Sequence, residues 1–285
     1  MDNKQNSTRI QWFPGHMTKA LRQMEKELKN IDLLLYCLDA RAPLSCLNPK
    51  LTQLASNKKI IYVLTKSDLV EAKDLEKFKR QLKSDNSDVV SVNSTQSNSA
   101  KSIFALSKEM MKQKLETRKE KGINYSLKAM VVGVPNVGKS TLINNLCRFS
   151  KTITGNKPGV TKGKQWVVTK EGLTLLDTPG TLWPSFDNAK TANNLAYIGS
   201  IRDEVLDLTE LAFSFLKEVM PKYVDLFEKR YNIKILDCTQ TLQVFEDICV
   251  ARKCLLKGQE LDYDRCAKLI LDDFRKNRIG KIMLD

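Results

Sequence analysis

The chain has 285 residues and is 42% hydrophobic, which is enough for one mid-sized domain and a smaller second one. Its seven cysteines include no C-x-x-C pair and it has a single histidine, so zinc sites built from cysteine and histidine are excluded. The N-terminus is short and polar, and no run approaches the roughly 18 apolar residues of a membrane span, so we expect a soluble cytoplasmic protein.

Positive charge is concentrated in one part of the chain, whose formal net charge is +14. Residues 1–184 hold 31 Lys and Arg against 16 Asp and Glu, whereas residues 185–285 hold 16 against 17. A solvated surface is the simpler explanation of such an excess. Its concentration in residues 1–184 nevertheless favours a polyanionic partner such as RNA, bound mainly by that part of the chain.

The hydrophobic pattern of residues 1–184 alternates between helices and buried strands. Apolar runs predict strands at 33–38, 60–64, 89–92 and 128–134, and a strand pair at 164–169 and 173–176. Helical spacing predicts helices at 16–30, 75–82, about 99–115 and from 139 or 140 onward, with a charged connector at 116–126. Further helices are expected at 189–200, 209–231 with a break at Pro221, 240–256 and 263–277. We therefore expect an α/β fold with a six-stranded, mostly parallel sheet in 1–184, followed by a small all-α domain in 185–285.

The segment Gly133–Ser140 fits G-x-x-x-x-G-K-[ST] and lies between a predicted strand and a predicted helix. Its glycines allow the tight backbone path that directs several N–H groups at phosphates, and the helix adds its positive N-terminal end. Lys139 should reach the β- and γ-phosphates of a nucleotide, and Ser140 should ligate Mg²⁺. A chance match is the alternative, which the strand and helix on either side disfavour. The phosphate-binding set is Asn136, Val137, Gly138, Lys139, Ser140 and Thr141.

A D-x-x-G motif begins with Asp177, 38 residues after Lys139. Asp177 ends a predicted strand and would support the same Mg²⁺ through water, and Gly180 can approach the γ-phosphate because it has no side chain. Thr161, in a Lys-Pro-Gly-Val-Thr segment, is a candidate switch threonine whose hydroxyl and carbonyl would close on Mg²⁺ and the γ-phosphate. A generic Pro-Gly turn is the alternative for that segment.

The segment Thr65–Asp68 reads as T-K-S-D, an [NT]-K-x-D motif, directly after a predicted strand. Asp68 can accept two hydrogen bonds from the N1–H and N2–H₂ of guanine, and the stem of Lys66 would lie over the ring. Adenine lacks that pair of donors and would leave the carboxylate unpaired, so the motif predicts GTP rather than ATP. Asn93 and Ser94 follow the next strand, where a loop touching the guanine O6 is expected.

The base-reading motif lies upstream of the phosphate-binding loop, which is the reverse of the order in an ordinary GTPase. If the strands of an ordinary GTPase are numbered one to six, their equivalents follow one another along this chain in the order four, five, six, one, two, three. The connector at 116–126 then stands where the ordinary chain has its two ends. The sequence therefore predicts a circularly permuted P-loop GTPase domain at 1–184, with the chain end moved to the loop after Gly180.

Together these residues resemble the RbgA (YlqF) family of circularly permuted ribosome-assembly GTPases, over nearly the whole chain. The resemblance also rests on Gln11–Met17, on Asp39–Pro43 with Asn48 and Pro49, and on Asp262–Lys281. It implies GTP hydrolysis during late maturation of the bacterial large (50S) ribosomal subunit, with contacts to 23S rRNA, and we expect a monomer. Because the loop after Gly180 runs on into residues 185–285, we also expect that RNA binding depends on the nucleotide. It also implies that Asn136 ligates K⁺, whose charge would stand in for an arginine finger; a loop residue tolerant of unusual φ and ψ is the alternative. Cys46 and Thr181 depart from the family pattern, in which a small hydroxyl residue and an apolar residue are typical.

No glutamine follows Gly180, although ordinary GTPases orient the attacking water with one. In the ordinary order that glutamine opens the helix leading into strand four; here that helix is 16–30, and His16 opens it. His16 is therefore the candidate catalytic residue, and the family resemblance points to it independently. A surface histidine at a helix start is the alternative. Without the glutamine, the chain could also be a GTP-gated RNA-binding module with negligible hydrolysis, whereas Lys66 and Asp68 disfavour a nucleotide kinase or an ATPase.

Overall fold

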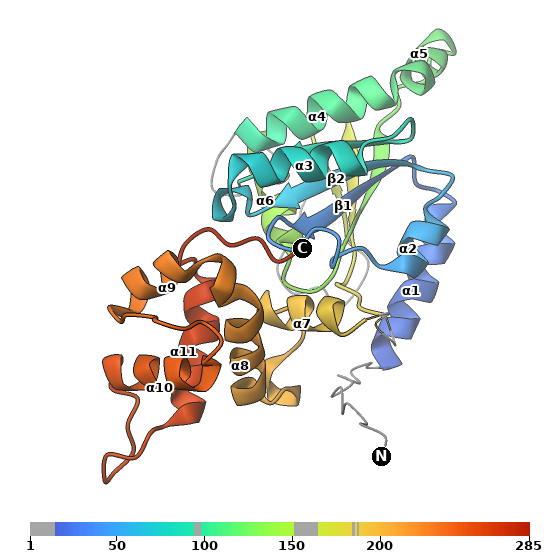
Figure 1. Cartoon of the computed structure of the whole chain (residues 1–285). Helices are drawn as coiled ribbons and strands as arrows, with labels where there is room; N and C mark the ends of the chain where they lie inside the picture. Colours follow the sequence, from blue (N-terminus) through green and yellow to red (C-terminus); the bar gives the residue numbers. More distant parts are fainter. Residues whose placement is uncertain (1–14, 94–97, 151–164, 184–185, 187) are drawn as a thin grey trace, which may run out of the picture. The chain divides into compact units, whose positions relative to one another are not determined.

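The computed structural model describes residues 15–93, 98–150, 165–183, 186 and 188–285. The chain divides into two compact units, one spanning Phe13–Pro184 and the other containing Ser185–Asp285. In the described residues, the first unit holds a sheet covered by helices, and the second is helical (Figure 1).

Six strands of the first unit form one sheet, in the order β3-β2-β1-β4-β6-β5. Their bounds are β1 Leu33–Asp39, β2 Lys59–Thr65, β3 Ser87–Ser91, β4 Leu127–Val132, β5 Gln165–Val168 and β6 Leu173–Asp177. Neighbouring strands from β3 to β6 pair in parallel, and β5 runs antiparallel beside β6. Every residue of β1 is buried, as expected for a central parallel strand that is covered on both faces. The six-stranded, mostly parallel sheet predicted from the sequence is confirmed.

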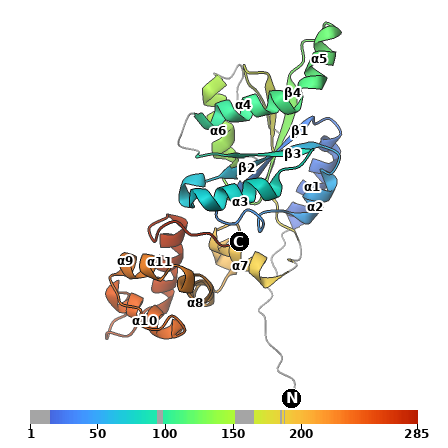
Figure 2. The same ribbon diagram turned by 45° about the horizontal axis from the view of Figure 1, so that its top comes forward.

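Helices cover both faces of this sheet. Figure 2 shows α4 Asn98–Met110 and α6 Lys139–Ser150, which contact each other, on one face, and α3 Ala72–Leu82 on the other. In α1 Gly15–Leu28, the side chains of Met17, Met24 and Leu28 are buried at a spacing that places them on one helical face. Each such apolar side chain contributes about 1.5–3 kcal/mol when it leaves water. Among the described residues, no helix combines the length and the apolar character needed to cross a membrane.

Two features of the first unit differ from expectation. A short helix, α2 Pro49–Leu54, is not predicted by the apolar spacing; the Asn48 side chain caps it by accepting hydrogen bonds from its first N–H groups. The helix expected at about 99–115 is broken at Met111 and continues as α5 Lys112–Glu120. The connector expected from residue 116 therefore starts later, because α5 continues to Glu120 and ends just before Gly122, which has a φ of 68°.

A buried carboxylate fastens this connector beside the start of β1. Asp32, only 6% exposed, accepts hydrogen bonds from Tyr125 Oη at 2.8 and 3.0 Å and from the backbone N–H of Lys128 at 2.8 Å. The ammonium of Lys114 on α5 pairs with the same carboxylate. Arg118 and Lys114 also lie over the Tyr125 ring, 5.0 and 5.5 Å from its centroid. These contacts hold the segment that joins α5 to β4, where the permutation would connect the two ordinary chain ends.

The second unit contains α7 Ala189–Tyr197, α8 Leu208–Val219, α9 Val224–Tyr231, α10 Thr241–Ala251 and α11 Tyr263–Arg275. The break expected at Pro221 is confirmed, since a 3₁₀ turn over Met220–Lys222 separates α8 from α9. α8 contacts α7, α10 and α11. Its Phe215 lies at the centre of an aromatic core, with ring centroids 5.1, 6.2 and 4.9 Å away for Tyr197, Phe227 and Phe274.

Basic side chains near the end of the chain are paired with carboxylates. Arg275 donates to both oxygens of Asp203, at 2.7 and 2.8 Å, and to the carbonyl oxygens of Ala196 and Tyr197. It thereby fastens the end of α11 to the end of α7. Lys276, Arg278 and Arg230 pair with Asp272 or Asp273. The buried Asp273 thus links Arg230 in the last turn of α9 to Arg278 after α11.

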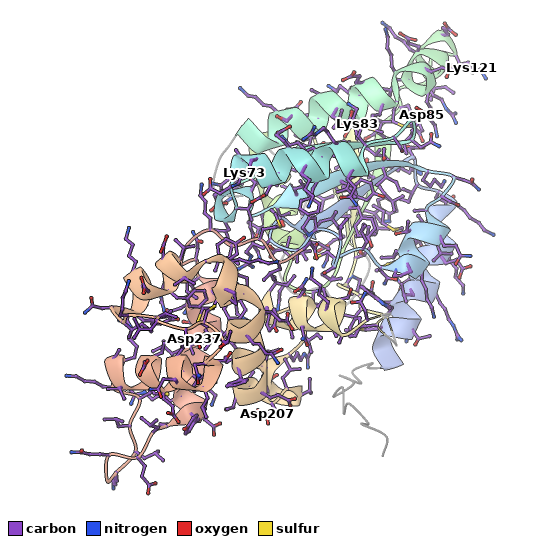
Figure 3. All side chains as sticks on the ribbon, viewed as in Figure 1. Lys73, Lys83, Asp85, Lys121, Asp207 and Asp237 are labelled. Atoms are coloured by element: carbon purple, nitrogen blue, oxygen red, sulfur yellow. The ribbon has the colours of Figure 1, made fainter. Side chains whose placement is uncertain are left out.

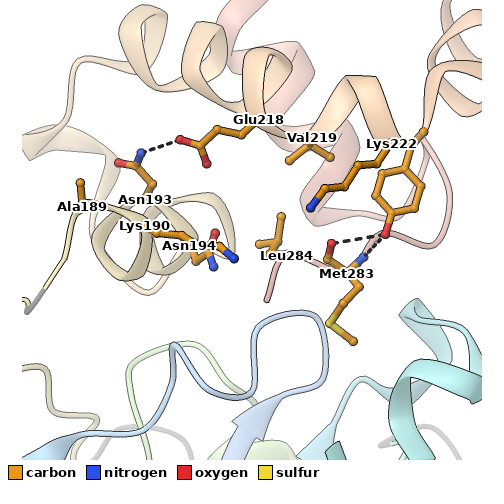
Figure 4. Close-up of a pocket in the computed structure, with 10 residues that line it drawn as sticks. Ala189, Lys190, Asn193, Asn194, Glu218, Val219, Lys222, Met283 and Leu284 are labelled. Carbon is orange, nitrogen blue, oxygen red and sulfur yellow. Dashed lines mark hydrogen bonds between the residues drawn. The ribbon is translucent and has the colours of Figure 1, made fainter. Parts of the chain in front are cut away.

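A cavity of about 330 Å³ opens in the second unit, lined by residues of α7, the end of α8, the turn after it and the last residues of the chain (Figure 4). Asn193 Nδ2 donates to Glu218 Oε1 at 3.1 Å on its wall. Tyr223 Oη donates to the carbonyl oxygen of Met283 and accepts from its N–H. The residues that line this cavity include none of those predicted to bind nucleotide.

Candidate active site

The predicted motifs meet at one edge of the sheet. Because β1, β2, β4 and β6 are parallel, their carboxyl ends lie side by side, with Asp39 opposite Thr65 and Val131 opposite Asp177. The glycine loop continues β4 at this edge. Ligands of open α/β sheets bind at the carboxyl ends of the strands. The chain order of the motifs is therefore reversed, but their place on the sheet is the one that nucleotide binding requires.

The backbone of the glycine loop accounts for several of its residue types. Gly133 has a φ of 147°, and a Cβ on it would lie 2.5 Å from the carbonyl oxygen of Cys37 on β1. Gly138 has a φ of 99°, and Asn136 has a left-handed φ of 59°. Asparagine adopts that region more readily than most residues with a side chain. The backbone conformation alone thus gives a reason for an asparagine at position 136.

The ammonium of Lys139 is turned into the glycine loop. The residue is 7% exposed, and its Nζ donates to the carbonyl oxygens of Gly133 at 3.1 Å and Val134 at 2.8 Å. Burial lowers the pKa of Lys139, against the opposing effect of Cys37 and Asp177 nearby. The charge thus lies inside the loop that is predicted to hold phosphates. Ser140 and Thr141 are exposed beside it, in the first turn of α6.

The D-x-x-G segment packs directly on the glycine loop. A Cβ on Gly180 would lie 2.7 Å from Cα and 2.8 Å from N of Pro135, and 2.8 Å from Nζ of Lys139. Only a residue without a side chain allows this approach. Asp177 ends β6 and is 5% exposed. The predicted phosphate-binding lysine and the predicted γ-phosphate sensor are therefore in contact.

Thr181 occupies a fully buried position directly after Gly180. Its N–H donates to the carbonyl oxygen of Gly133 at 3.3 Å, which gives the D-x-x-G segment a second attachment to the glycine loop. Its hydroxyl finds no hydrogen-bond partner among the described residues. Burying such a hydroxyl costs about 1–3 kcal/mol. An apolar residue, typical of the family that the chain resembles, would avoid that cost.

The Thr65–Asp68 segment is joined to the glycine loop by two hydrogen bonds. Thr65 Oγ1 donates to the carbonyl oxygen of Val137 at 2.5 Å, and Lys66 Nζ donates to the carbonyl oxygen of Asn136 at 3.1 Å. Lys66 itself has a left-handed φ of 54°. Asp68 follows in a 3₁₀ turn over Ser67–Leu69 and is exposed, as a carboxylate that meets a base must be.

A buried ion-pair network at the same edge is not predicted from the sequence. Asp39 is fully buried and accepts from Arg41 Nε at 2.9 Å, from Arg41 NH2 at 2.8 Å and from Lys66 Nζ at 2.7 Å. Burial alone would raise the pKa of Asp39, but the charges and hydrogen bonds of Arg41 and Lys66 outweigh it and hold the pKa below its ordinary value. The signal in the sequence is a carboxylate at the end of a buried strand with an arginine two positions later.

Some predicted site residues lie outside the described part of the structure: Ser94, Thr161 and the side chain of His16. Asn93, half-buried, follows β3 as expected. Met17, the neighbour of His16 in the first turn of α1, is buried, and its Sδ accepts from the N–H of Leu182 at 3.4 Å. The start of α1 therefore packs against the segment that follows Gly180.

Two oxygen ligands suited to Mg²⁺ flank the glycine loop. The hydroxyl of Ser140 is exposed at the start of α6, and the carboxylate of Asp177 stands at the end of β6. Mg²⁺ prefers such oxygen ligands and usually completes its shell with water and substrate phosphates. Within the described residues there is no group of three or more His, Cys, Asp or Glu that could hold a metal by itself.

Known proteins resemble this chain over nearly its whole length. A family model described as "50S ribosome-binding GTPase" matches residues 128–237, a stretch that begins in β4 directly before the glycine loop. Two proteins named "Ribosome biogenesis GTPase A", from Bacillus licheniformis and Bacillus pumilus, are 36% and 35% identical, over 97% of this chain and 98% of theirs. The crystal structure of GNP-bound YlqF from T. maritima has a TM-score of 0.64 and 24% identity, covering 94% of this chain and 97% of that one. Relatives this similar, over nearly the full length of both chains, show that the chain belongs to the ribosome biogenesis GTPase A family.

Proposed function

We propose that the chain hydrolyses GTP at the carboxyl edge of its sheet and acts in late maturation of the bacterial large (50S) ribosomal subunit. The observation that carries the proposal is the hydrogen bond from Lys66 Nζ to the carbonyl oxygen of Asn136, which joins the base-reading motif to the phosphate-binding loop despite their reversed order. The contact of Gly180 with the same loop supports the proposal, since it brings the D-x-x-G segment against the phosphate-binding loop. Relatives named ribosome biogenesis GTPases support the ribosomal role.

The phosphates would lie along the loop from Asn136 to Thr141, against the N–H groups at the start of α6. Lys139 Nζ would exchange its two carbonyl acceptors for phosphate oxygens. Ser140 and Asp177 would hold Mg²⁺, with Thr161 as the switch ligand, and the ion would neutralise charge on the β- and γ-oxygens. Gly180 would contact the γ-phosphate, since its backbone already touches the loop.

Guanine would be read by Asp68, whose exposed carboxylate can accept from two ring donors. The stem of Lys66 would cover one face of the base while its ammonium remains bound to the protein. Asn93 and Ser94, after β3, would contact O6. GTP and GDP would bind alike through these residues, and ATP would be rejected because it leaves Asp68 unpaired.

His16 would orient the attacking water, because Thr181 stands where an ordinary GTPase has its glutamine. The contact between Met17 and Leu182 supports this role, since it holds the first turn of α1 beside the segment after Gly180. K⁺ held by Asn136 would supply the positive charge that an arginine finger supplies in other GTPases. That part of the proposal rests on the family resemblance, because the left-handed φ of Asn136 is compatible with a purely conformational role.

Contacts with 23S rRNA would be made mainly by residues 1–184, which carry 31 basic against 16 acidic residues. α5 supports this assignment, since none of its residues is buried and Figure 3 shows Lys121 just beyond its outer end. The segment after Gly180 leads directly into residues 185–285, so its γ-phosphate contact could make binding depend on the nucleotide. We also propose that the protein works as a cytoplasmic monomer with two domains, 1–184 and 185–285.

A GTP-gated RNA-binding module with negligible hydrolysis remains the second candidate, favoured by the missing glutamine after Gly180. Single-turnover hydrolysis of GTP, with and without immature large subunits, separates the two. The enzyme should show turnover that the particles stimulate, and His16→Ala should reduce the stimulated rate by about 10²–10⁴-fold while GTP binding persists. Equal stimulated rates for wild type and His16→Ala would remove His16 from the mechanism, and no hydrolysis in either condition would favour the binding module.

A further inference from the structure

The loop after β1 carries an ion pair for which the proposed scheme of GTP hydrolysis has no use. Asp39 and Arg41 belong to the segment Asp39–Pro43, and both side chains are almost completely buried, at 0% and 2% exposed. Arg41 is the largest fully buried side chain among the described residues. A buried charge pair costs desolvation energy that an apolar pair of similar size would avoid. The presence of a charged pair at this buried position therefore needs an explanation other than a gain in stability.

The guanidinium of Arg41 fixes the orientation of the Asp39 carboxylate. Nε donates to Oδ1 at 2.9 Å and NH2 donates to Oδ2 at 2.8 Å, which is the two-pronged geometry that leaves a carboxylate no freedom to rotate. The backbone N–H of Arg41 also donates to Oδ1, at 3.1 Å. Oδ2 then directs its remaining lone pair at the third partner, Lys66 Nζ, at 2.7 Å.

Lys66 is the point at which this pair meets the proposed nucleotide site. Its Nζ donates both to Asp39 Oδ2 and to the carbonyl oxygen of Asn136 in the glycine loop. Its backbone has a left-handed φ of 54°, a conformation that a lysine keeps only where its surroundings hold it. With the backbone at one end and the ammonium at the other end both fixed, the aliphatic stem between them has little freedom left.

We propose that Asp39 and Arg41 are a positioning pair for guanine recognition, which acts through Lys66 by holding its stem where the base stacks and its ammonium against the glycine loop. The proposal rests on the GTP site proposed above and assigns a role to residues that touch neither base nor phosphate. Arg41 orients the Asp39 carboxylate, and Asp39 holds the Lys66 ammonium. The stem of Lys66 then presents a preformed surface to the guanine ring. A preformed surface raises affinity because no rotamer freedom is lost when the base binds.

Two consequences separate this role from a purely structural one. Loss of the pair should weaken ligands that carry guanine and spare pyrophosphate, which needs only the glycine loop. Loss of the pair should also have little effect once Lys66 is gone, because residues that act through one another give non-additive effects. A pair that merely stabilises the edge of the sheet would affect both ligands equally, and its effect would add to that of Lys66.

The test compares the Asp39→Asn/Arg41→Met double variant, Lys66→Met and their triple combination by calorimetric titration with GDP and with pyrophosphate. Removing both charges avoids leaving an unpaired guanidinium in the interior. We expect the double variant and Lys66→Met each to lose about 10–100-fold in GDP affinity, the usual worth of a charge-assisted hydrogen bond. The triple variant should bind GDP with an affinity within about threefold of that of Lys66→Met. The affinity of each variant for pyrophosphate should change by less than about threefold.

Lys59→Met is the matched control, since Lys59 lies at the other end of β2 and its Nζ donates to the backbone carbonyl oxygen of Asp85 and to Asn86 Oδ1, both exposed. If the double variant melts below the assay temperature, Arg41→Lys alone serves, because its ammonium keeps a positive charge beside Asp39 but cannot form the bidentate contact that orients the carboxylate. Additive losses of GDP affinity, or equal losses for GDP and pyrophosphate, would overturn the positioning role. Failure of the wild-type protein to bind GDP would instead overturn the proposed function itself.

Discussion

Gly180→Ala is the substitution that tests most simply whether the D-x-x-G segment and the glycine loop work together. The added Cβ would lie 2.7 Å from the Cα of Pro135, 2.8 Å from its N and 2.8 Å from Lys139 Nζ. Carbon atoms in good contact are about 3.5–4.0 Å apart, so the methyl group overlaps its neighbours by about 1 Å. Two of the three neighbours are backbone atoms of the glycine loop and cannot swing aside.

The segment after Asp177 must then move away from the loop, or the loop itself must deform. Overpacking of this kind costs about 1–3 kcal/mol, which should appear as a lower free energy of unfolding in urea. The contact between Gly180 and the γ-phosphate is expected with GTP but not with GDP. Since about 1.4 kcal/mol is a factor of ten in affinity, the affinity for a non-hydrolysable GTP analogue should fall by about tenfold or more, and that for GDP much less.

Gly172→Ala is the control for a general effect of replacing glycine. Gly172 has a φ of 88° and nothing within 4 Å of its would-be Cβ, so the variant should lose only the cost of a left-handed alanine, about 1–2 kcal/mol. Its ratio of GTP-analogue to GDP affinity should match wild type. An unchanged ratio in Gly180→Ala as well would refute the reasoning, because the contact with the glycine loop would then have no bearing on the γ-phosphate.

Three further outcomes can be measured on the same preparations. Thr181→Val should raise the free energy of unfolding by about 1 kcal/mol, because it removes a buried hydroxyl without a partner in the described structure; a destabilised variant would mean that the hydroxyl is bound. Tyr125→Phe should lower the free energy of unfolding by about 1–2 kcal/mol, because Tyr125 Oη donates to the buried Asp32 carboxylate. An unchanged urea midpoint would contradict the view that this hydrogen bond holds the segment between α5 and β4. Alanine at three exposed lysines should weaken rRNA binding and reduce its salt dependence by about one unit of log–log slope per lost phosphate contact, whereas an unchanged slope would exclude α5 from the RNA surface. Those lysines are Lys112, Lys119 and Lys121.

Elements with a strong hydrophobic period were predictable, and elements set by single local interactions were not. The run at residues 33–38 is apolar throughout, as a strand covered on both faces must be, so its assignment as a buried strand of a parallel sheet followed from the sequence. α2 is too short to show a period and exists because the Asn48 side chain caps it. The break at Met111 lies between two segments that both favour helix, and no glycine or proline marks it.

The candidate site was predictable wherever a motif stands at the end of a strand. Lys139, Asp177 and the Thr65–Asp68 segment all lie at the carboxyl edge of the sheet, where the strand assignments placed them. The hydrogen bonds that connect these motifs were not predictable, because they depend on which strands are neighbours and on side-chain direction. The Asp39 network shows this, since its arginine and lysine come from different loops. The roles assigned to all of these residues remain predictions, as do those of His16, Ser94 and Thr161, which lie outside the described part of the structure or have a side chain outside it.

The central claim is that the reordered motifs form one hydrolytic site that recognises guanine. Its most direct test measures hydrolysis of GTP and of xanthosine triphosphate, stimulated by immature large subunits, for wild type and for Asp68→Asn. The 2-oxo group of xanthine accepts a hydrogen bond where the 2-amino group of guanine donates one, so an amide at position 68 should reverse the preference. In the presence of immature large subunits, wild type should hydrolyse GTP in preference, and Asp68→Asn should hydrolyse xanthosine triphosphate in preference. An Asp68→Asn protein that still hydrolyses GTP at the wild-type rate would contradict the account, because the base would then be read by residues other than those that follow β2.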